Sequence, residues 1–155
     1  MSPTLGDNFP KEYREEYCER HFKSWAVFRL FSKETTPPKI KRFVVAGINE
    51  ETGQVAILFI NTNPLQNPNL KKEQMLLKSK DRPYLGHDSY LDCSKIYERT
   101  ISEIKEIFLN DTSAYLDTMS ERDISEAKAI IRMSRIISLK TKEKYNLIQS
   151  SSMVG

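Results

Sequence analysis

Polar side chains that could act on a substrate stand at the ends of several short apolar runs in the chain. They are Arg42, Asn61, Thr62, His87, Ser89, Asp92 and Ser94. A strand end and the loop that follows it are where a rigid sheet can hold side chains toward a substrate. His87 is a candidate acid or base, because an imidazole can exchange a proton near neutral pH. We therefore expect a site at the end of a β-sheet.

Each of these residues also has a purely structural interpretation. Arg42 fits a solvated cation at a strand end, and His87 fits a loop histidine bonded to the backbone. Asn61 and Thr62 are typical of residues that cap a turn. The residue types alone leave both interpretations open.

Motifs of the common cofactor-dependent and hydrolytic classes are absent from the sequence. It has no glycine-rich nucleotide loop, no HExxH, no CxxC and no GxSxG. The two histidines, His21 and His87, stand far apart, and neither has a His or Cys partner at metal-ligand spacing. We therefore expect neither a metal site nor a cofactor.

Length and composition predict one domain. The chain has 155 residues, 39% of them hydrophobic, with seven Tyr, seven Phe and one Trp, which is typical of globular proteins. Cys18 and Cys93 are too few for a disulfide framework, so we interpret both as reduced thiols. The net charge of +3 is too small for coating nucleic acid by global charge. Because no apolar run approaches the roughly 20 residues of a membrane helix, we expect a soluble, cytoplasmic protein without a membrane partner.

Five short apolar segments have the composition of strands. They are residues 25–31, 43–48, 55–60, 75–77 and 88–93. The turn residues 49–53 join the second and third segments into the clearest hairpin signal of the chain. The run 33–38, with two prolines, ends the first strand. In the last segment, alternation places Tyr90 and Asp92 on one face and Leu91 on the other.

Helical patterns stand before and after these strands. The aromatic spacing in residues 12–21 predicts a short helix that covers one edge of the core. Ser120, with Asp123 three positions later, predicts a helix start, and the isoleucines that follow predict a helix over 121–137 packed on the sheet. Residues 101–108 fit either a helix or a strand end. Because strands come first and helices later, the order indicates an α+β fold.

Taken in order, these segments resemble the MazF/PemK-like toxins, small bacterial endoribonucleases built on an SH3-like β-barrel. The family's first strand is similar to residues 24–30, and its RPVVVIS motif is similar to residues 42–47, which read RFVVAG. Its third strand ends in a small polar residue, as residues 58–62 do here. The front half of its SYVLLDQIRTI segment is similar to residues 89–96, and its closing turn and helix start are similar to residues 115–124.

The resemblance implies a fold and its boundaries. The implied fold is α+β, a small SH3-like antiparallel β-barrel with a C-terminal helix and an N-terminal helical extension. The extension is residues 1–23, the single domain is residues 24–149, and residues 150–155 are a frayed tail. Two departures stand out, since Asp117 replaces the family's glycine and residues 102–113 look like an insertion.

The resemblance also implies an activity. In the family, RNA is cut without a metal: a base helps the ribose 2′-OH attack the adjacent phosphate, and a cation stabilises the developing oxyanion. By this likeness Arg42 binds the phosphate, and Thr62, or Asn61, orients the scissile group. Some members carry a further Arg and Asp pair in the segment that is occupied here by Asp92, Cys93 and Ser94, where this sequence has no arginine. The implied substrate contacts in and just before that segment are Ser89, Asp92 and Ser94.

We therefore expect a sequence-selective endoribonuclease, the toxin of a type II toxin–antitoxin pair, which cuts single-stranded RNA. Its expected partners are a cognate antitoxin protein and a second copy of the chain. One alternative is a catalytically reduced member of the fold that binds nucleic acid or protein, and another is an interaction domain with a coincidental likeness. Arg42 and Thr62 favour the enzyme, whereas the missing arginine near Asp92 favours the binding module.

Overall fold

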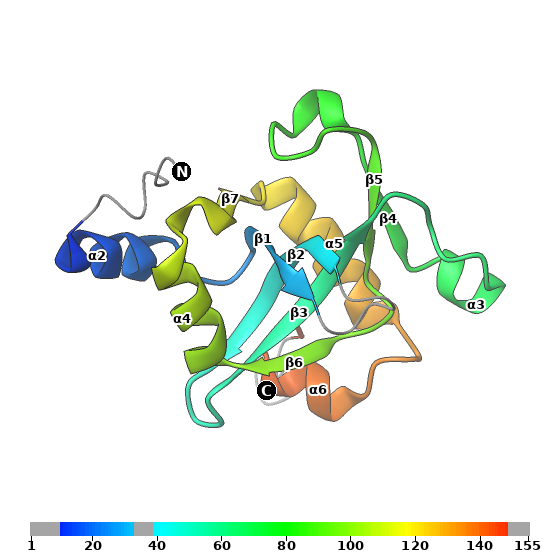
Figure 1. Cartoon of the computed structure of the whole chain (residues 1–155). Coiled ribbons are helices and arrows are strands. Elements are labelled where there is room, and N and C mark those ends of the chain that lie inside the picture. The colour runs from blue at the N-terminus through cyan, green and yellow to red at the C-terminus, as the bar shows by residue number, and fades with distance from the viewer. Residues whose placement is uncertain (1–9, 33–38, 149–155) are drawn as a thin grey trace.

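The computed structural model describes residues 10–32 and 39–148 and shows an α+β fold (Figure 1). The strands are β1 (Ala26–Ser32), β2 (Lys39–Asn49), β3 (Gln54–Asn61), β4 (Gln74–Leu77), β5 (Ser89–Asp92), β6 (Tyr97–Thr100) and β7 (Tyr115–Thr118). The helices are α2 (Lys11–His21), α3 (Pro68–Lys71), α4 (Ile101–Asn110), α5 (Glu121–Met133) and α6 (Leu139–Lys144). Short 3-10 turns cover Ser79–Asp81 and Thr112–Ala114. None of the helices described is long and apolar enough to cross a membrane.

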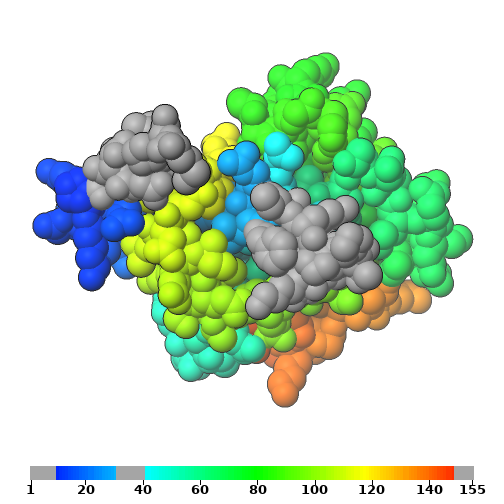
Figure 2. Space-filling model, viewed as in Figure 1, coloured from blue at the N-terminus to red at the C-terminus, as the bar shows by residue number. Residues whose placement is uncertain are grey.

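The strands form one antiparallel sheet that curls into a half-barrel. Its order is β4-β5-β3-β2-β1-β7, and β6 pairs with β3 on the same edge as β5. β3 therefore pairs with β2 along one edge and with two successive strands along the other. The segment between β4 and β5, green in Figure 2, projects from the upper part of the molecule.

Both faces of the curled sheet are covered by helices. On one face, Ala127 and Ile131 of α5 pack into a core with Val44 and Leu58 of the central strands. On the other, Phe108 of α4 belongs to a second core that also takes in α2 (Figure 1). A strand that is buried on both faces needs apolar side chains at every position. This is why β3 reads as an unbroken apolar run over Val55–Ile60, all of it buried.

Most of the elements expected from the sequence are present. The hairpin of β2 and β3 forms around residues 49–53, and α2 closely matches the helix expected at 12–21. The helix contributes Cys18 to the second core and thus covers one edge of the core, as expected. The undecided segment 101–108 is helical, because Thr100 caps α4 by accepting a hydrogen bond from the Glu103 N–H. The run 33–38 and the tail 150–155 lie outside the described residues.

The helix expected over 121–137 starts where predicted and ends early. Ser120 caps it by accepting a 3.1 Å hydrogen bond from the Asp123 N–H. The helix ends at Met133, because Ser134 turns the chain and its hydroxyl accepts hydrogen bonds from the next turn. Lys142 of α6 is buried there and donates to the carbonyl of Ser134 (2.7 Å) and to that of Arg132 (3.1 Å). A buried ammonium at a helix C-terminus satisfies carbonyls that have no partner within the helix.

Gly47 fits α6 against the sheet. It follows a register shift in β2, and a Cβ atom at this position would lie 2.7 Å from Cβ and 3.0 Å from the carbonyl oxygen of Tyr145. Because the main chain of Tyr145 must move to admit a methyl group, Gly47→Ala is expected to lower the free energy of unfolding by about 1–3 kcal/mol. Urea unfolding measures this change. Gly86→Ala is the matched control, since nothing lies within 4 Å of its Cβ position; an equal loss in both variants would contradict the packing argument.

Candidate functional site

A pocket of about 420 Å³ lies at the end of the sheet and is called the rim pocket here. It gathers five of the seven residues expected from the sequence. It is lined by Lys41, Arg42, Ile60, Asn61, Thr62, Asn63, His87 and Ser89. The pairing of the strands explains this arrangement, since Arg42 of β2 stands opposite Ile60 of β3, and Asn61 stands opposite Tyr90 of β5.

Arg42 supplies the rim pocket with a cation that has bonding capacity left. Its Nε is buried and has no hydrogen-bond partner in the part of the chain that the structure describes. Arg29 of β1 stands directly opposite Arg42 in the antiparallel register, so both side chains lie on one face of the sheet. A buried donor without a partner is costly, and two facing cations repel each other. An anion in the rim pocket would relieve the repulsion between the two cations.

The orientation of His87 is set by its neighbours. Its Nδ1 lies 3.1 Å from the carbonyl oxygen of Asp88 and 3.3 Å from Oγ of the buried Ser89. The Ser89 hydroxyl also donates to the carbonyl of His87 (3.0 Å). Among residues 10–32 and 39–148, nothing hydrogen-bonds Nε2 of this exposed ring. The imidazole is therefore held on one side and can exchange a proton on the other.

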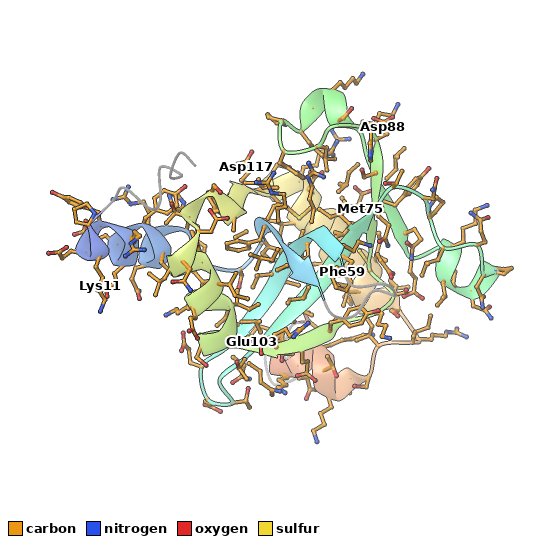
Figure 3. The ribbon with its side chains drawn as sticks, viewed as in Figure 1. Lys11, Phe59, Met75, Asp88, Glu103 and Asp117 are labelled. Atoms are coloured by element: carbon orange, nitrogen blue, oxygen red, sulfur yellow. The ribbon has the colours of Figure 1, made fainter. Side chains whose placement is uncertain are left out.

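Asp88, which Figure 3 labels, ties the loop that carries His87 to the preceding turn. The Asp88 carboxylate accepts hydrogen bonds from the N–H (2.9 Å) and the hydroxyl (3.2 Å) of Ser79. Both bonds lower the pKa of Asp88, and the bond from the Ser79 N–H has the larger effect. The loop thus has a fixed point next to the imidazole.

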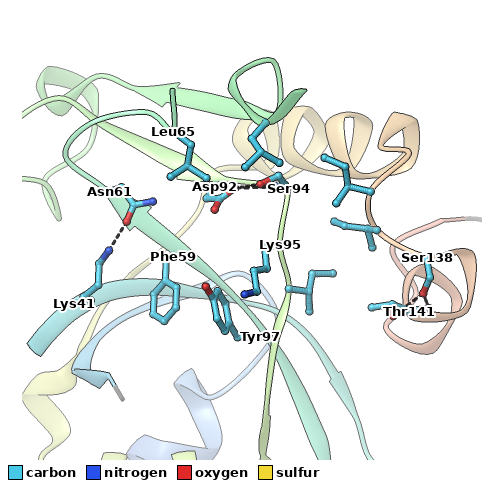
Figure 4. Close-up of a pocket in the computed structure, with 14 residues that line it drawn as sticks. Lys41, Phe59, Asn61, Leu65, Asp92, Ser94, Lys95, Tyr97, Ser138 and Thr141 are labelled. Atoms are coloured by element: carbon cyan, nitrogen blue, oxygen red, sulfur yellow. Dashed lines mark hydrogen bonds between the residues drawn. The ribbon is translucent and has the colours of Figure 1, made fainter. Parts of the chain in front are cut away.

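The remaining two predicted residues, Asp92 and Ser94, line a different pocket of about 620 Å³, which is called the aromatic pocket here (Figure 4). Lys41 and Asn61 line both pockets, so the two are neighbours. The other lining residues are Phe59, Leu65, Leu70, Lys95, Ile96, Tyr97, Ile136, Ile137, Ser138 and Thr141. The structure therefore divides the predicted site into two adjoining parts.

Asp92 is held firmly in the wall of the aromatic pocket. The residue is only 7% exposed, and its Oδ1 accepts hydrogen bonds from the Ser94 N–H (2.9 Å), the Ser94 hydroxyl (2.5 Å) and Nε2 of Gln74 (2.8 Å). Ser94 is thus a residue that positions Asp92. Three donors on one oxygen leave the second oxygen, Oδ2, as the acceptor that faces other groups.

Among the lining residues that sequence reasoning missed, four are charged or aromatic, namely Lys41, Phe59, Lys95 and Tyr97. Lys41 hydrogen-bonds to Oδ1 of Asn61, and its ammonium lies 5.2 Å from the ring centroid of Phe59. Lys95 lies in the same way 4.6 Å from the ring centroid of Tyr97. Lys41 could have been predicted from the sequence, because it stands next to Arg42 and residues at one strand end lie at the same edge of the sheet. Tyr97 could not have been predicted in this way, since its strand, which reads YERT, has no apolar run.

Neither thiol has the properties of a nucleophile. Cys18 and Cys93 are both free and buried. Burial raises the pKa of each thiol, and the nearby Asp92 carboxylate raises that of Cys93 further. The thiolate is the reactive form, so both groups are inert at neutral pH. In the portion of the chain described, no three His, Cys, Asp or Glu side chains are grouped so that they could hold a metal ion.

Comparison with known proteins assigns no family: no family model matches the chain, and no curated protein matches it. The function therefore has to be argued from the two pockets. The rim pocket combines a cation with spare donors, an oriented imidazole and two polar side chains of a strand end. Such a group can bind a phosphate and exchange a proton beside it.

Proposed function

We propose that the protein is a metal-independent, sequence-selective endoribonuclease that acts in the cytoplasm as the toxin of a type II toxin–antitoxin system. The observation that carries the proposal is the rim pocket, where Arg42, with its unpartnered Nε, meets His87 and Thr62. These are the residues to which the resemblance to MazF/PemK-like toxins, or their chemistry, gave a role. The curled antiparallel sheet is compatible with the SH3-like barrel of that family, and assigning it there is part of the proposal.

The proposed reaction is an internal transfer at phosphorus. A base takes the proton of the ribose 2′-OH, and O2′ attacks the adjacent phosphorus while the bond to O5′ breaks. The leaving oxygen takes up a proton, so the products are a 2′,3′-cyclic phosphate and a 5′-OH. Arg42 stabilises the charge on the phosphoryl oxygens, because a guanidinium can donate two parallel hydrogen bonds to them. His87 exchanges the proton through Nε2, and Thr62 orients the phosphate.

Incubation of the pure protein with a long unstructured RNA in the presence of EDTA tests this function. We expect cleavage at a limited set of sequences, with 2′,3′-cyclic phosphate and 5′-OH ends on the mapped products. The His87→Ala variant, purified in the same way, is the control, because cleavage that persists in it would come from a contaminating nuclease. Intact RNA at an excess of folded wild-type protein would eliminate the enzyme.

One observation favours the catalytically reduced binding module as a second candidate. The segment around Asp92 lacks the arginine that some family members carry, and the Asp92 carboxylate is buried in a separate pocket. A carboxylate repels a phosphate group, so Asp92 does not replace the missing arginine in the cleavage reaction. Binding of RNA without any cleavage, measured on the same samples, would select this candidate.

We also propose a two-fold homodimer, with the interface near Tyr90 and Ile101, and a cognate antitoxin protein as partner. Apolar side chains are exposed at both places: Leu76, directly opposite Tyr90 in the sheet, is 43% exposed, and Ile107 of α4 is 38% exposed. A symmetric dimer would bury such surface. Light scattering is expected to give twice the chain mass of 18.0 kDa. A single-chain mass at micromolar concentration would contradict the dimer.

A further inference from the structure

The aromatic pocket has a different chemistry from the rim pocket next to it. It combines two aromatic rings with a buried carboxylate and an amide, and two lysines lie over the rings (Figure 4). We infer that the aromatic pocket receives one nucleobase of the RNA and selects a base that carries an exocyclic amine. The inference rests on the proposed function, because it assigns the specificity of the same RNA-binding site.

Asp92 gives the aromatic pocket a fixed hydrogen-bond acceptor. Its Oδ1 already accepts three hydrogen bonds from Gln74 and Ser94, and no residue within the described ranges donates to Oδ2. A carboxylate that is more than nine-tenths buried is costly unless donors surround it. Oδ2 is not one of the buried atoms that lack a partner, so solvent reaches it, and a ligand that displaces water there has to bring an N–H or O–H group in its place.

Asn61 gives the pocket a donor on the same side. Its Oδ1 is occupied by Lys41, which leaves the amide nitrogen to donate. Asn61 pairs with Tyr90, and Asp92 lies two positions further along β5, so the two side chains are diagonal neighbours on one face. Diagonal neighbours are about 7–8 Å apart at their Cα atoms. An acceptor and a donor at this spacing match a planar base edge that presents an amine beside a ring nitrogen.

Cytosine and uracil differ at this edge, and the pocket should tell them apart. Cytosine presents an amine that donates to Oδ2 of Asp92, next to a ring nitrogen that accepts from Asn61. Uracil presents a carbonyl oxygen where cytosine has the amine, and its single ring N–H stands between two carbonyls. A carboxylate repels those oxygens at short range. The pocket thus disfavours uracil.

The rings and lysines complete a nucleotide-sized site. Phe59 is 7% exposed and packs edge to face against Tyr97, with centroids 4.7 Å apart. Tyr97 is partly exposed, and a base can stack on its ring once Lys95 moves from the ring face. Lys41 and Lys95 bring positive charge to the phosphates that flank a bound base. Because Lys41 and Asn61 also line the rim pocket, the selected base is a neighbour of the scissile phosphate.

The test measures binding without cleavage. Oligocytidine and oligouridine of equal length, with 2′-O-methyl groups that remove the attacking hydroxyl, are titrated into the wild-type protein and followed by fluorescence anisotropy. The wild type is expected to bind oligocytidine about tenfold more tightly, the value of one well-formed base contact. Asp92→Asn retains an oxygen for Ser94 and Gln74 and replaces Oδ2 by an amide N–H. This variant is expected to lose the preference or to favour oligouridine.

Asp111→Asn is the matched control, because Asp111 accepts hydrogen bonds from the N–H and hydroxyl of Ser113 in the same local pattern, outside both pockets. It should keep the wild-type preference. Equal binding of the two oligonucleotides by the wild type overturns the inference, whether or not Asp92→Asn folds, and so does an unchanged preference in folded Asp92→Asn. A wild type that prefers oligocytidine but cuts no RNA supports the inference and removes the proposed nuclease. Cleavage by a wild type without this preference supports the proposed nuclease and overturns the inference.

Discussion

Replacing Arg42 with alanine is expected to lower the rate of RNA cleavage about a hundredfold or more and to leave the melting temperature nearly unchanged. The rate falls because a lost donor to the transition-state charge costs roughly 3 kcal/mol of barrier. Folding is insensitive because Nε of Arg42 has no partner to lose and because removal ends the repulsion with Arg29. Single-turnover cleavage and thermal unfolding measure the two effects.

Two further substitutions sharpen this result. Arg42→Lys keeps the charge but loses the two parallel hydrogen bonds, so it should lose most of the rate if bidentate contact with phosphate is the cause. Arg29 is unsuitable as a neutral control, because it faces Arg42 across the strands. Arg122 is exposed on α5 and lines neither pocket, so Arg122→Ala should cut RNA at the wild-type rate. Equal rates for wild type and Arg42→Ala would refute the proposed role of this guanidinium.

Breaking the ion pair between Arg82 and Asp123 is expected to destabilise the fold by about 3–5 kcal/mol. The Arg82 guanidinium donates to both carboxylate oxygens of Asp123, at 2.8 and 2.7 Å, and the two side chains are 17% and 5% exposed. Removal of Arg82 leaves the buried Asp123 carboxylate without its partner, and removal of Asp123 leaves the Arg82 guanidinium with only the Lys78 carbonyl as acceptor among the described residues. The pair joins the segment before β5 to the start of α5, so Asp123→Ala should loosen both elements. Urea denaturation measures the loss.

A double-mutant cycle separates the ion pair from the rest of the packing. Arg82→Leu combined with Asp123→Ala should lose less stability than the sum of the single variants, since neither charge is then left alone. The exposed pair of Lys11 and Glu15, with nitrogen and oxygen 4.0 Å apart, is the control. Its disruption should change the free energy of unfolding by well under about 1 kcal/mol. Full additivity at Arg82 and Asp123 would show that the pair does not act as a unit.

The sequence predicts those elements whose local signals agree with their tertiary environment. Turn residues between two apolar runs predict the hairpin of β2 and β3, and Ser120 predicts the start of α5. β6 escapes prediction because Tyr97–Thr100 is held by pairing with β3, with alternate side chains exposed, and not by an apolar pattern. α6 escapes because its sequence, LKTKEK, is polar, and the burial of Lys142 arises only from the carbonyls at the end of α5.

Reasoning from strand ends finds the residues of the rim pocket, because antiparallel pairing brings the start of β2 and the end of β3 to the same rim. The same reasoning does not predict that the candidate residues lie in two separate pockets. Leu91 and Tyr97 lie six positions apart but pair with Ile60 and Ile57, which lie three apart. The surplus residues loop out between β5 and β6, and Ser94 moves with them into the second pocket. Asp92 stays in β5, opposite Gln74, and lines that pocket because alternation places it on the other face of the strand from Ser89. No local pattern reports a surplus of this kind, since it depends on which strand lies alongside.

The place of β1 in the sheet has a consequence for how the chain folds as it is made. β1 is flanked by β2, which follows it closely in the chain, and by β7, which follows about ninety positions later. Bringing two such distant segments together lowers the chain entropy before the contact between them contributes any favourable energy, and this slows folding. On the ribosome, β1 must wait with one edge unpaired until β7 emerges, and an unpaired edge invites other strands. This interval is when the newly made chain is most prone to mispairing, and when a chaperone or a binding partner present during synthesis has most to protect.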